Sequence, residues 1–187
     1  LEYTRLCLES IRKYTPEPHE IIVVDNGSTD GTVEYLENQP DVKLIKNGYN
    51  LGFALGNNRG LREAKRDYIV FLNNDVVVTE GWLTRLLACA REDGRVGAVG
   101  PRSNYVTGPQ LVPGVPYGEN LKVMQEFARK WSLEHAGQWE TVPRVIGFCM
   151  LVKRGVIEKI GGFDPAFGTG NFEDDDFCLR LQLAGFT

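Results

Sequence analysis

The sequence predicts an α/β fold, with a mostly parallel β-sheet that is covered by helices on both faces. Three observations lead to this prediction. Short β-branched and apolar runs, such as residues 20–25 and 68–72, alternate with segments whose apolar residues recur at helical spacing. These runs lack polar alternation, which is typical of strands buried between two helical layers. The 187 residues suit one domain of ordinary size.

Each element follows from a local pattern of apolar residues and breakers. At the start, Cys7, Leu8 and Ile11 recur at helical spacing, and Pro16 ends this pattern before residues 20–25, which we expect to form a buried strand. The same reasoning predicts helices at residues 32–36, 53–64 and 82–90 and strands at residues 42–45, 68–72 and 96–99.

The second half of the chain is less regular. Residues 101–118 contain several prolines and glycines and predict a surface loop, which we expect to be mobile because loops of this length are usually functional or disordered. A polar helix at residues 119–135 and a strand at residues 144–152 follow. The expected buried stripe of this helix consists of Leu121, Met124, Phe127 and Trp131.

Composition and charge exclude several classes of protein. Hydrophobic residues make up 42% and charged residues 25%, as in ordinary globular domains. A net charge of −4 without a cluster of Lys and Arg argues against nucleic acid as a partner. No apolar stretch approaches the roughly 20 residues of a membrane span, and the N-terminus has no signal-peptide pattern.

The four cysteines are scattered along the chain, and each lies in an apolar stretch. We therefore expect small buried hydrophobic side chains in a reducing compartment, and no metal or disulfide framework. These residues are Cys7, Cys89, Cys149 and Cys178.

An acidic cluster precedes the last helical pattern. Glu173, Asp174, Asp175 and Asp176 place four carboxylates in a row before an apolar segment. Asp176 as a helix N-cap, with acids near the positive helix end, explains one or two of them. A carboxylate whose pKa is raised by its neighbours can instead act as a general base. From this segment alone, the two interpretations are evenly matched.

Two predicted strands end in aspartates, and ligands of open parallel sheets bind beyond such strand ends. Asp25 begins a Gly-rich turn and can accept hydrogen bonds from a nucleotide. Turn chemistry with Asp30 as an N-cap is the better explanation of residues 26–30, and for Asp25 the two interpretations are evenly matched. Residues 73–75, Asn-Asn-Asp, can supply oxygens to a divalent cation held by a diphosphate, and an Asx turn is the alternative.

Taken together, these motifs resemble the family 2 glycosyltransferases, which are inverting enzymes with a Rossmann-like GT-A fold, and in particular their rhamnosyltransferase-like members. The resemblance covers nearly the whole chain as a single domain, with residues 1–100 as a nucleotide-binding half and residues 101–187 as an acceptor and catalytic half. The matching segments are IVVDNGSTDGT (22–32), NLGFA (50–54), FLNND (71–75), GFCMLV (147–152), GGFD (161–164) and EDDDFCLRL (173–181).

The resemblance implies roles for individual residues. Asp174 matches the catalytic base, with Glu173 beside it, and Asp75 matches a metal ligand in a motif that usually holds more Asp. Asp175 stands where the family often has an apolar residue, which leaves open a base shared between neighbours. Gly147 begins a strand near the donor and acceptor sugars. The residues that match the nucleotide pocket are Asp25, Asn26, Ser28, Asn50, Gly52, Asn57, Asn73 and Asn74.

The implied function is inverting transfer of a sugar from a nucleotide-sugar donor to a hydroxyl of a carbohydrate or lipid-linked acceptor, with Mg²⁺ or Mn²⁺ as cofactor. Donors of similar members include dTDP-rhamnose and UDP-hexoses. The implied location is the cytoplasm or the inner face of the membrane. A nucleotide-sugar-binding module without turnover is the alternative, since the metal motif holds one acid. A phosphatase-like or receiver-like domain also fits a strand-end Asp, but it gives the acidic cluster no role.

Two family features are missing between residues 1 and 187. Family members carry a central strand before the first helix, and many place a metal-binding His beyond the last one. Neither His19 nor His135 matches that position, and His19 reads as a plain surface residue. We expect the complete protein to supply the strand before Leu1 and at least one element after Thr187, and residues 1–187 alone to fold poorly.

Overall fold

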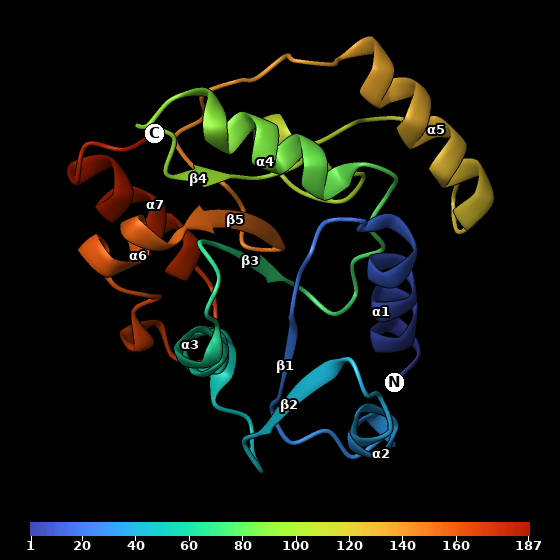
Figure 1. The fold of residues 1–187 in the computed structure, drawn as a ribbon, viewed down its shortest axis with the longest axis vertical. Coiled ribbons are helices and arrows are strands. Elements are labelled where there is room, and N and C mark those ends of the chain that lie inside the picture. Colours follow the sequence, from blue (N-terminus) through green and yellow to red (C-terminus); the bar gives the residue numbers. More distant parts are fainter.

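The β-strands form two small sheets in a computed structural model that describes residues 1–187 (Figure 1). Strand β1 (Ile21–Asp25) pairs in parallel with β2 (Val42–Lys46). Strand β5 (Cys149–Lys153) lies between β3 (Tyr68–Leu72) and β4 (Ala98–Val99) and runs antiparallel to both. The predicted α/β class is confirmed, with a parallel pair and an inserted antiparallel strand.

The first five α-helices begin and end close to the predicted residues, whereas the helix at Arg154–Ile160 was not predicted. Their positions along the chain alternate with those of the strands, as expected from the sequence pattern. The α-helices are α1 (Glu2–Tyr14), α2 (Thr32–Glu37), α3 (Gly52–Glu63), α4 (Trp82–Glu92), α5 (Leu121–Glu134), α6 (Arg154–Ile160) and α7 (Glu173–Leu183), and the short 3₁₀-helices are η1 (Gly108–Gln110) and η2 (Pro165–Phe167).

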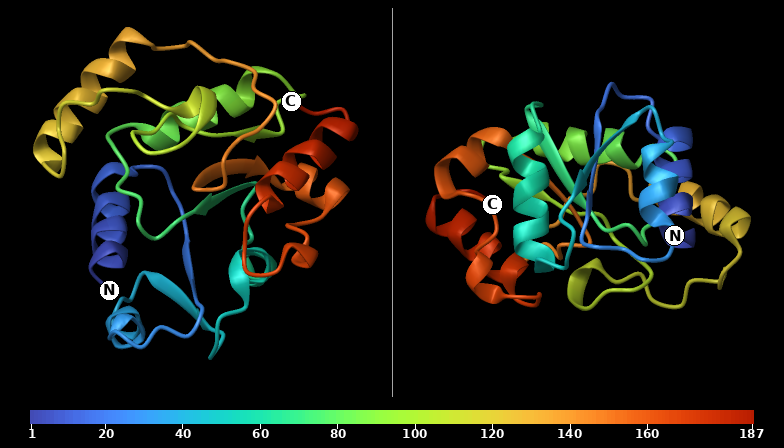
Figure 2. Two further views of the ribbon diagram at one scale, coloured as in Figure 1. Left: turned by 180° about the vertical axis from the view of Figure 1, so that it is seen from behind. Right: turned by 90° about the horizontal axis from the view of Figure 1, so that it is seen from below.

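Helices lie on both faces of the sheet that contains β5 (Figure 2). Alternate residues of β5 contribute to two separate core clusters, one on each face. Met150 and Val152 pack into a cluster with residues of α3, α6 and α7, while Cys149 and Leu151 pack against α4. All four residues are at most 1% exposed. Because both faces are covered, β5 reads as a continuous apolar run, as expected for a fully buried strand.

The strand predicted at residues 144–152 is shorter than expected, since β5 begins at Cys149. The backbone N–H groups of Ile146 and Gly147 are bound by side chains of Gln110 and Asp174 in place of strand partners. Residues 144–148 therefore leave the sheet and border the candidate site. The predicted strand at residues 96–99 is similarly reduced to Ala98–Val99.

The prediction that β1 is a buried strand is wrong. Ile21 to Val24 are only half-buried, although Asp25 at the strand end is buried. The cause is the sheet topology: β1 hydrogen-bonds to β2 on one side, and its other edge has no strand partner. Strand β3 is likewise an edge strand of its own sheet, so no ladder joins the two sheets.

Three further expectations need correction. Helix α5 has no buried residue, so the predicted stripe is at most partly covered, and Leu121 is 39% exposed. Its rings stack on one another instead: Phe127 on Trp131 and Trp131 on His135. Cys89 is half-exposed, unlike the other three cysteines, and all four are free thiols.

The segment at residues 101–118 is anchored to the core and is not purely a surface loop. Gln110 and Val112 are buried, and the Ser103 N–H donates to the Gln110 carbonyl oxygen at 2.8 Å. His19 is exposed, as predicted. None of the helices combines the length and the apolar character needed to cross a membrane.

Candidate active site

The acidic cluster forms the first turn of α7. The N-cap is Phe172, and Asp176 lies inside the helix, so the N-cap prediction for Asp176 is wrong. Asn171 and Phe172 have φ angles of 89° and 68°. Non-glycine residues rarely adopt this left-handed conformation, and such strain concentrates at functional sites. The chain is thus turned sharply just before the four carboxylates.

Asp174 is held at the start of α7 by two backbone N–H groups. Its Oδ2 accepts from Gly147 at 2.9 Å and its Oδ1 accepts from Asp175 at 3.0 Å. The residue is half-exposed. A carboxylate fixed in this way has lone pairs left for a substrate hydroxyl. Asp174 is therefore a candidate for a general base.

Asp175 pairs with Arg144, which lies in the same segment as Gly147. The Nη1 atom of Arg144 lies 2.9 Å and 2.8 Å from the two carboxylate oxygens of Asp175. The hydrogen bond to Asp175 raises the pKa of the Arg144 guanidinium, and the negative charges of Asp175 and Asp174 add to this effect. Arg144 thereby neutralises one of the crowded acids.

Asp176 has a structural partner. Its Oδ2 accepts from Arg180 Nε at 2.8 Å, one helical turn later. Arg180 also donates to the carbonyl oxygens of Ile160 and Gly162, at 2.8 Å and 2.9 Å. This ion pair therefore ties the first turn of α7 to the end of α6 and the segment that follows it.

Glu173 is 7% exposed, and its Oε2 has no hydrogen-bond partner in the protein. The side chain lies near Gly170, where an added Cβ would be 3.9 Å from Oε1. The four neighbouring acids thus differ in their surroundings. Asp175 and Asp176 are paired with arginines, Asp174 is held by backbone N–H groups, and the remaining acid is buried.

The end of β3 presents one uncommitted carboxylate. The Asn73 N–H donates to the Phe148 carbonyl oxygen at 2.9 Å, so residue 73 lies beside the segment that carries Gly147. The Asn74 side chain donates to Thr4 Oγ1 at 3.0 Å and so is used to hold α1. Asp75 is exposed and makes no hydrogen bond or ion pair within the chain. Burial of the Cys7 thiol is the main cause that raises its pKa to about 12, and the negative charge of Asp75 adds to this effect.

A divalent cation fits these residues in donor chemistry. Mg²⁺ and Mn²⁺ prefer oxygen ligands, and a cation that also binds a diphosphate needs few of them from protein. The free carboxylate of Asp75 and the amide oxygen of Asn73 are of this type. No group of three or more His, Cys, Asp or Glu gathers as a metal cluster anywhere in the structure.

The carboxylate of Asp25 is buried and organises its own loop. It accepts from the Gly27 N–H at 2.9 Å and from the Ser28 N–H at 3.2 Å, which is the turn geometry considered above. Ser28 itself is exposed. β1 and β3 belong to different sheets, and no hydrogen bond joins Asp25 to Asp75.

Asn26 connects this loop to α3. Its side chain donates to the Gly52 carbonyl oxygen at 3.2 Å and accepts from Asn47 at 2.7 Å. Asn50 Oδ1 accepts from the Gly52 N–H at 2.8 Å. Gly52 has a φ of 80°, and a Cβ there would lie 2.4 Å from the Gly168 carbonyl oxygen. The close approach that Gly52 permits is thus to the loop before α7.

The side chains of Asn57 and Asn58 bind different parts of the backbone. The Asn57 side chain donates to the Phe53 carbonyl oxygen of its own helix at 3.0 Å. Asn58 binds both backbone groups of Phe163, at 2.7 Å and 3.0 Å, and so fixes the segment between α6 and η2. A nucleotide contact by Asn57 stays a prediction.

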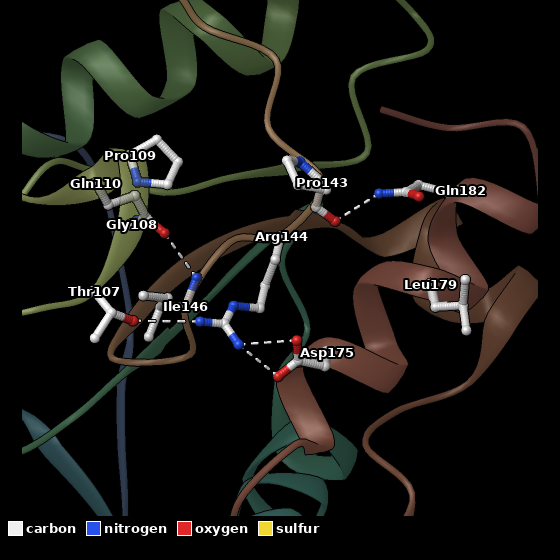
Figure 3. Close-up of a pocket in the computed structure, with 10 residues that line it drawn as sticks. All are labelled: Thr107, Gly108, Pro109, Gln110, Pro143, Arg144, Ile146, Asp175, Leu179 and Gln182. Atoms are coloured by element: carbon white, nitrogen blue, oxygen red, sulfur yellow. Dashed lines mark hydrogen bonds and ion pairs between the residues drawn. The ribbon is translucent and has the colours of Figure 1, made fainter.

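A polar pocket of about 480 Å³ adjoins the acidic turn (Figure 3). Its walls are residues 107–110, one face of α7, and the residues Pro143, Arg144 and Ile146. The Arg144–Asp175 ion pair lies in the pocket, and Gln182 Nε2 donates to the Pro143 carbonyl oxygen at 2.6 Å. The buried Gln110 joins two walls, since its Oε1 accepts from the Ile146 N–H at 2.8 Å.

Comparison with known proteins identifies the family. The family described as "Glycosyl transferase family 2" matches residues 1–161. The chain belongs to this family. The loop after β1 and the end of β3 lie within the matched residues, and the first turn of α7 lies beyond them.

Individual relatives agree with this assignment. The N-acetylglucosaminyl-diphospho-decaprenol L-rhamnosyltransferase of Mycobacterium tuberculosis is 29% identical over 96% of this chain and 66% of its own length. The O-antigen biosynthesis protein RfbC of Myxococcus xanthus is 30% identical over 97% of this chain, which covers 15% of that protein. The chain therefore spans less than two thirds of the length of these relatives.

A solved structure shows the same fold. The mannosyltransferase PcManGT from Pyrobaculum calidifontis, solved with GDP-Man and Mn²⁺, superposes with a TM-score of 0.68. It is 22% identical, and the match covers 99% of this chain and 49% of that one. The GT-A fold expected from the sequence is thereby confirmed.

Sequence reasoning missed Arg144, Gln110 and the role of Arg180. For Arg180 a signal existed, because Asp176 lies four residues earlier, the spacing of an ion pair on a helix. Arg144 meets Asp175 of α7, and Gln110 meets Ile146, only through folding across more than 30 residues, and no local pattern marks either contact.

Proposed function

We propose that the protein transfers a sugar from a nucleotide-sugar donor to a hydroxyl of a carbohydrate or lipid-linked acceptor, with inversion at the anomeric carbon. The observation that carries this proposal is the carboxylate of Asp174, half-exposed and fixed by the N–H groups of Gly147 and Asp175 at the start of α7. It supports a base that is oriented before the substrate arrives, which lowers the cost of reorganisation.

The reaction is one displacement. The acceptor hydroxyl oxygen forms a bond to the anomeric carbon as the bond from that carbon to the diphosphate oxygen breaks. Asp174 takes the hydroxyl proton, and the electron pair of the broken bond leaves with the nucleoside diphosphate. Glu173 immediately precedes Asp174 in the sequence and is buried, and in this proposal it assists Asp174 from the same helical turn.

Asp75, with Asn73 beside it, would hold the divalent cation, which when bound stabilises negative charge on a diphosphate. The loop that Asp25 and Ser28 form, together with Asn26, Asn50, Gly52 and Asn57, supports a nucleotide pocket at the β1 end of the molecule. A cytoplasmic location, free or at the inner membrane face, is part of this proposal.

The first experiment is a melt of the protein with MnCl₂ and UDP, GDP or dTDP in turn. One nucleotide should raise the melting temperature more than the others, and this increase should depend on Mn²⁺. The matching nucleotide-sugar should then be hydrolysed slowly without acceptor, and the released sugar should first appear with inverted configuration by NMR. No stabilisation by any nucleotide would refute the proposal. Stabilisation without hydrolysis or transfer would favour the binding module.

A further inference from the structure

The pocket beside the acidic turn is placed to receive an acceptor. Ile146 in its wall immediately precedes Gly147, whose N–H binds Asp174, and Asp175 in its wall immediately follows Asp174. The pocket and the Asp174 carboxylate are thus one residue apart along both segments. Asp174 does not line the pocket, but its negative charge acts on Arg144, which does, so the Asp174 carboxylate stands close to the pocket.

The pocket also has fixed donors and acceptors. Arg144 directs Nη1 to Asp175, and its Nη2 lies 3.4 Å from Thr107 Oγ1, while its Nε–H has no partner in the protein. Asp175 can accept further hydrogen bonds, and the Gln182 amide oxygen is uncommitted. This ion pair exists without ligand, so little ordering is needed on binding.

The charge of the pocket favours a neutral ligand. The cation of Arg144 is balanced by Asp175, and the carboxylate of Asp174 stands next to it. A phosphate in this place would face two carboxylates with one guanidinium. A sugar hydroxyl both donates and accepts, and it matches the mixed set of groups without added charge.

We infer that this pocket binds a neutral sugar unit of the acceptor, with the Arg144–Asp175 ion pair hydrogen-bonded to its hydroxyls. The inference rests on the proposed function, because it assigns the acceptor side of the same reaction. Leu179 and Ile146 supply the apolar surface against which a sugar ring packs.

The test measures binding directly, by saturation-transfer NMR on the full chain. The probes are methyl glycosides of glucose, galactose, mannose, N-acetylglucosamine and rhamnose, and the 1-phosphates of the same sugars. At least one methyl glycoside should receive saturation, and it should do so more strongly than its sugar phosphate. Binding by none of the glycosides, or by the phosphates alone, would overturn the inference.

Two leucines of α7 give a matched pair of variants. Leu179 lines the pocket and is 56% exposed, whereas Leu183 lies one turn later, outside the pocket, and is 80% exposed. Leu179→Trp should fill the pocket and abolish the glycoside signal, and Leu183→Trp should keep it. Circular dichroism and the melt verify that both variants fold. Equal signals from both would contradict the inference.

A third variant tests the ion pair. Arg144→Gln keeps a polar side chain but removes the charged donor, so it should weaken glycoside binding about tenfold. Unchanged affinity would overturn the role of the pair. Nucleotide stabilisation with Mn²⁺ is measured on the same wild-type sample. Its failure would count against the proposed function, and loss of the glycoside result alone would count against the pocket.

Discussion

Asp174 is joined to Gly147 by a 2.9 Å hydrogen bond from the backbone N–H to Oδ2. A Cβ at position 147 would lie 3.5 Å from the Cβ of Asp174 and 3.3 Å from the Phe53 ring. The start of α7, the segment before β5 and the first turn of α3 therefore fit together at one point. This junction decides where the base of the proposed reaction stands.

Asp174→Asn should lower turnover by about 10² to 10⁴ while nucleotide binding survives, because it removes the proton acceptor. Asparagine has one oxygen, so one of the two N–H groups that bind Asp174 will face the amide nitrogen, and a lower melting temperature is also expected. The measurements are steady-state transfer and a nucleotide titration.

Asp176→Asn is the control for this variant. It makes the same chemical change in the same helical turn, but Asp176 binds Arg180 and not a backbone segment of the site. It should reduce stability and keep transfer at temperatures below its melt. Near-normal transfer by Asp174→Asn would rule out the base assignment, and equal loss in both variants would indicate a merely structural effect.

Asp75→Ala should remove the Mn²⁺ dependence of nucleotide binding, since Asp75 is the one uncommitted carboxylate at the end of β3. Calorimetric titration of nucleotide with and without MnCl₂ measures this. Glu80→Ala removes another exposed carboxylate from the same connection between β3 and α4 and should leave the Mn²⁺ dependence intact. Identical Mn²⁺ titrations for wild type and Asp75→Ala would leave Asp75 as a turn residue.

Local patterns were sufficient to predict most of the elements, but they predicted neither α6 nor the N-cap of α7. The apolar run at residues 68–72 matches β3 residue for residue, since it is bounded by polar residues on both sides. The burial of β1 was predicted wrongly because burial depends on which strand lies beside it, and neither the composition nor the spacing of residues 21–24 contains that information.

The candidate site divides in the same way. Sequence motifs gave Asp174, Asp75 and Asp25 as candidate residues, because each lies at a turn or a strand end that a local pattern marks. The motifs did not predict that Arg144 pairs with Asp175, because 31 residues separate the two in the sequence. Gly52 was expected to admit a ligand, and its close neighbour is the backbone at residues 168–169, which a one-dimensional pattern cannot show.

The buried thiols make stability fall at alkaline pH. Burial is the main cause that raises the pKa values of Cys7 and Cys149 to about 12, from an ordinary 9.0. Between these values the unfolded chain releases thiol protons that the folded chain retains. Their stabilising contribution is therefore complete below pH 9 and is lost as the pH rises toward 12, by about 1.4 kcal/mol per pH unit for each thiol.

Melts of wild type and Cys7→Ala between pH 7 and 11 measure this loss. The slope of stability against pH above about 9 should be smaller in the variant, because one thiol no longer titrates on unfolding. In the folded protein at pH 8, a thiol reagent should modify the half-exposed Cys89 first. Parallel slopes, or modification of Cys7 as fast as Cys89, would contradict the burial of these thiols.

Gly52→Ala should disturb the start of α7 from a distance, and Gly48→Ala isolates the cause. Both glycines have positive φ angles, 80° and 77°, so alanine is strained at both by about 1 kcal/mol. At Gly48 the new Cβ meets nothing within 4 Å, whereas at Gly52 it would lie 2.4 Å from the Gly168 carbonyl oxygen and 2.9 Å from the Thr169 Cα.

The Gly48 variant should therefore lose only about 2–4 °C of melting temperature, as expected for about 1 kcal/mol in a domain of this size. The Gly52 variant should lose at least about twice as much, because backbone must move to relieve the overlap. That movement displaces residues 168–172 and with them the turn that presents Asp174, so turnover should fall in Gly52→Ala and not in Gly48→Ala. Equal melting temperatures and equal turnover in the two variants would show that the contact between Gly52 and the loop before α7 does not position the base.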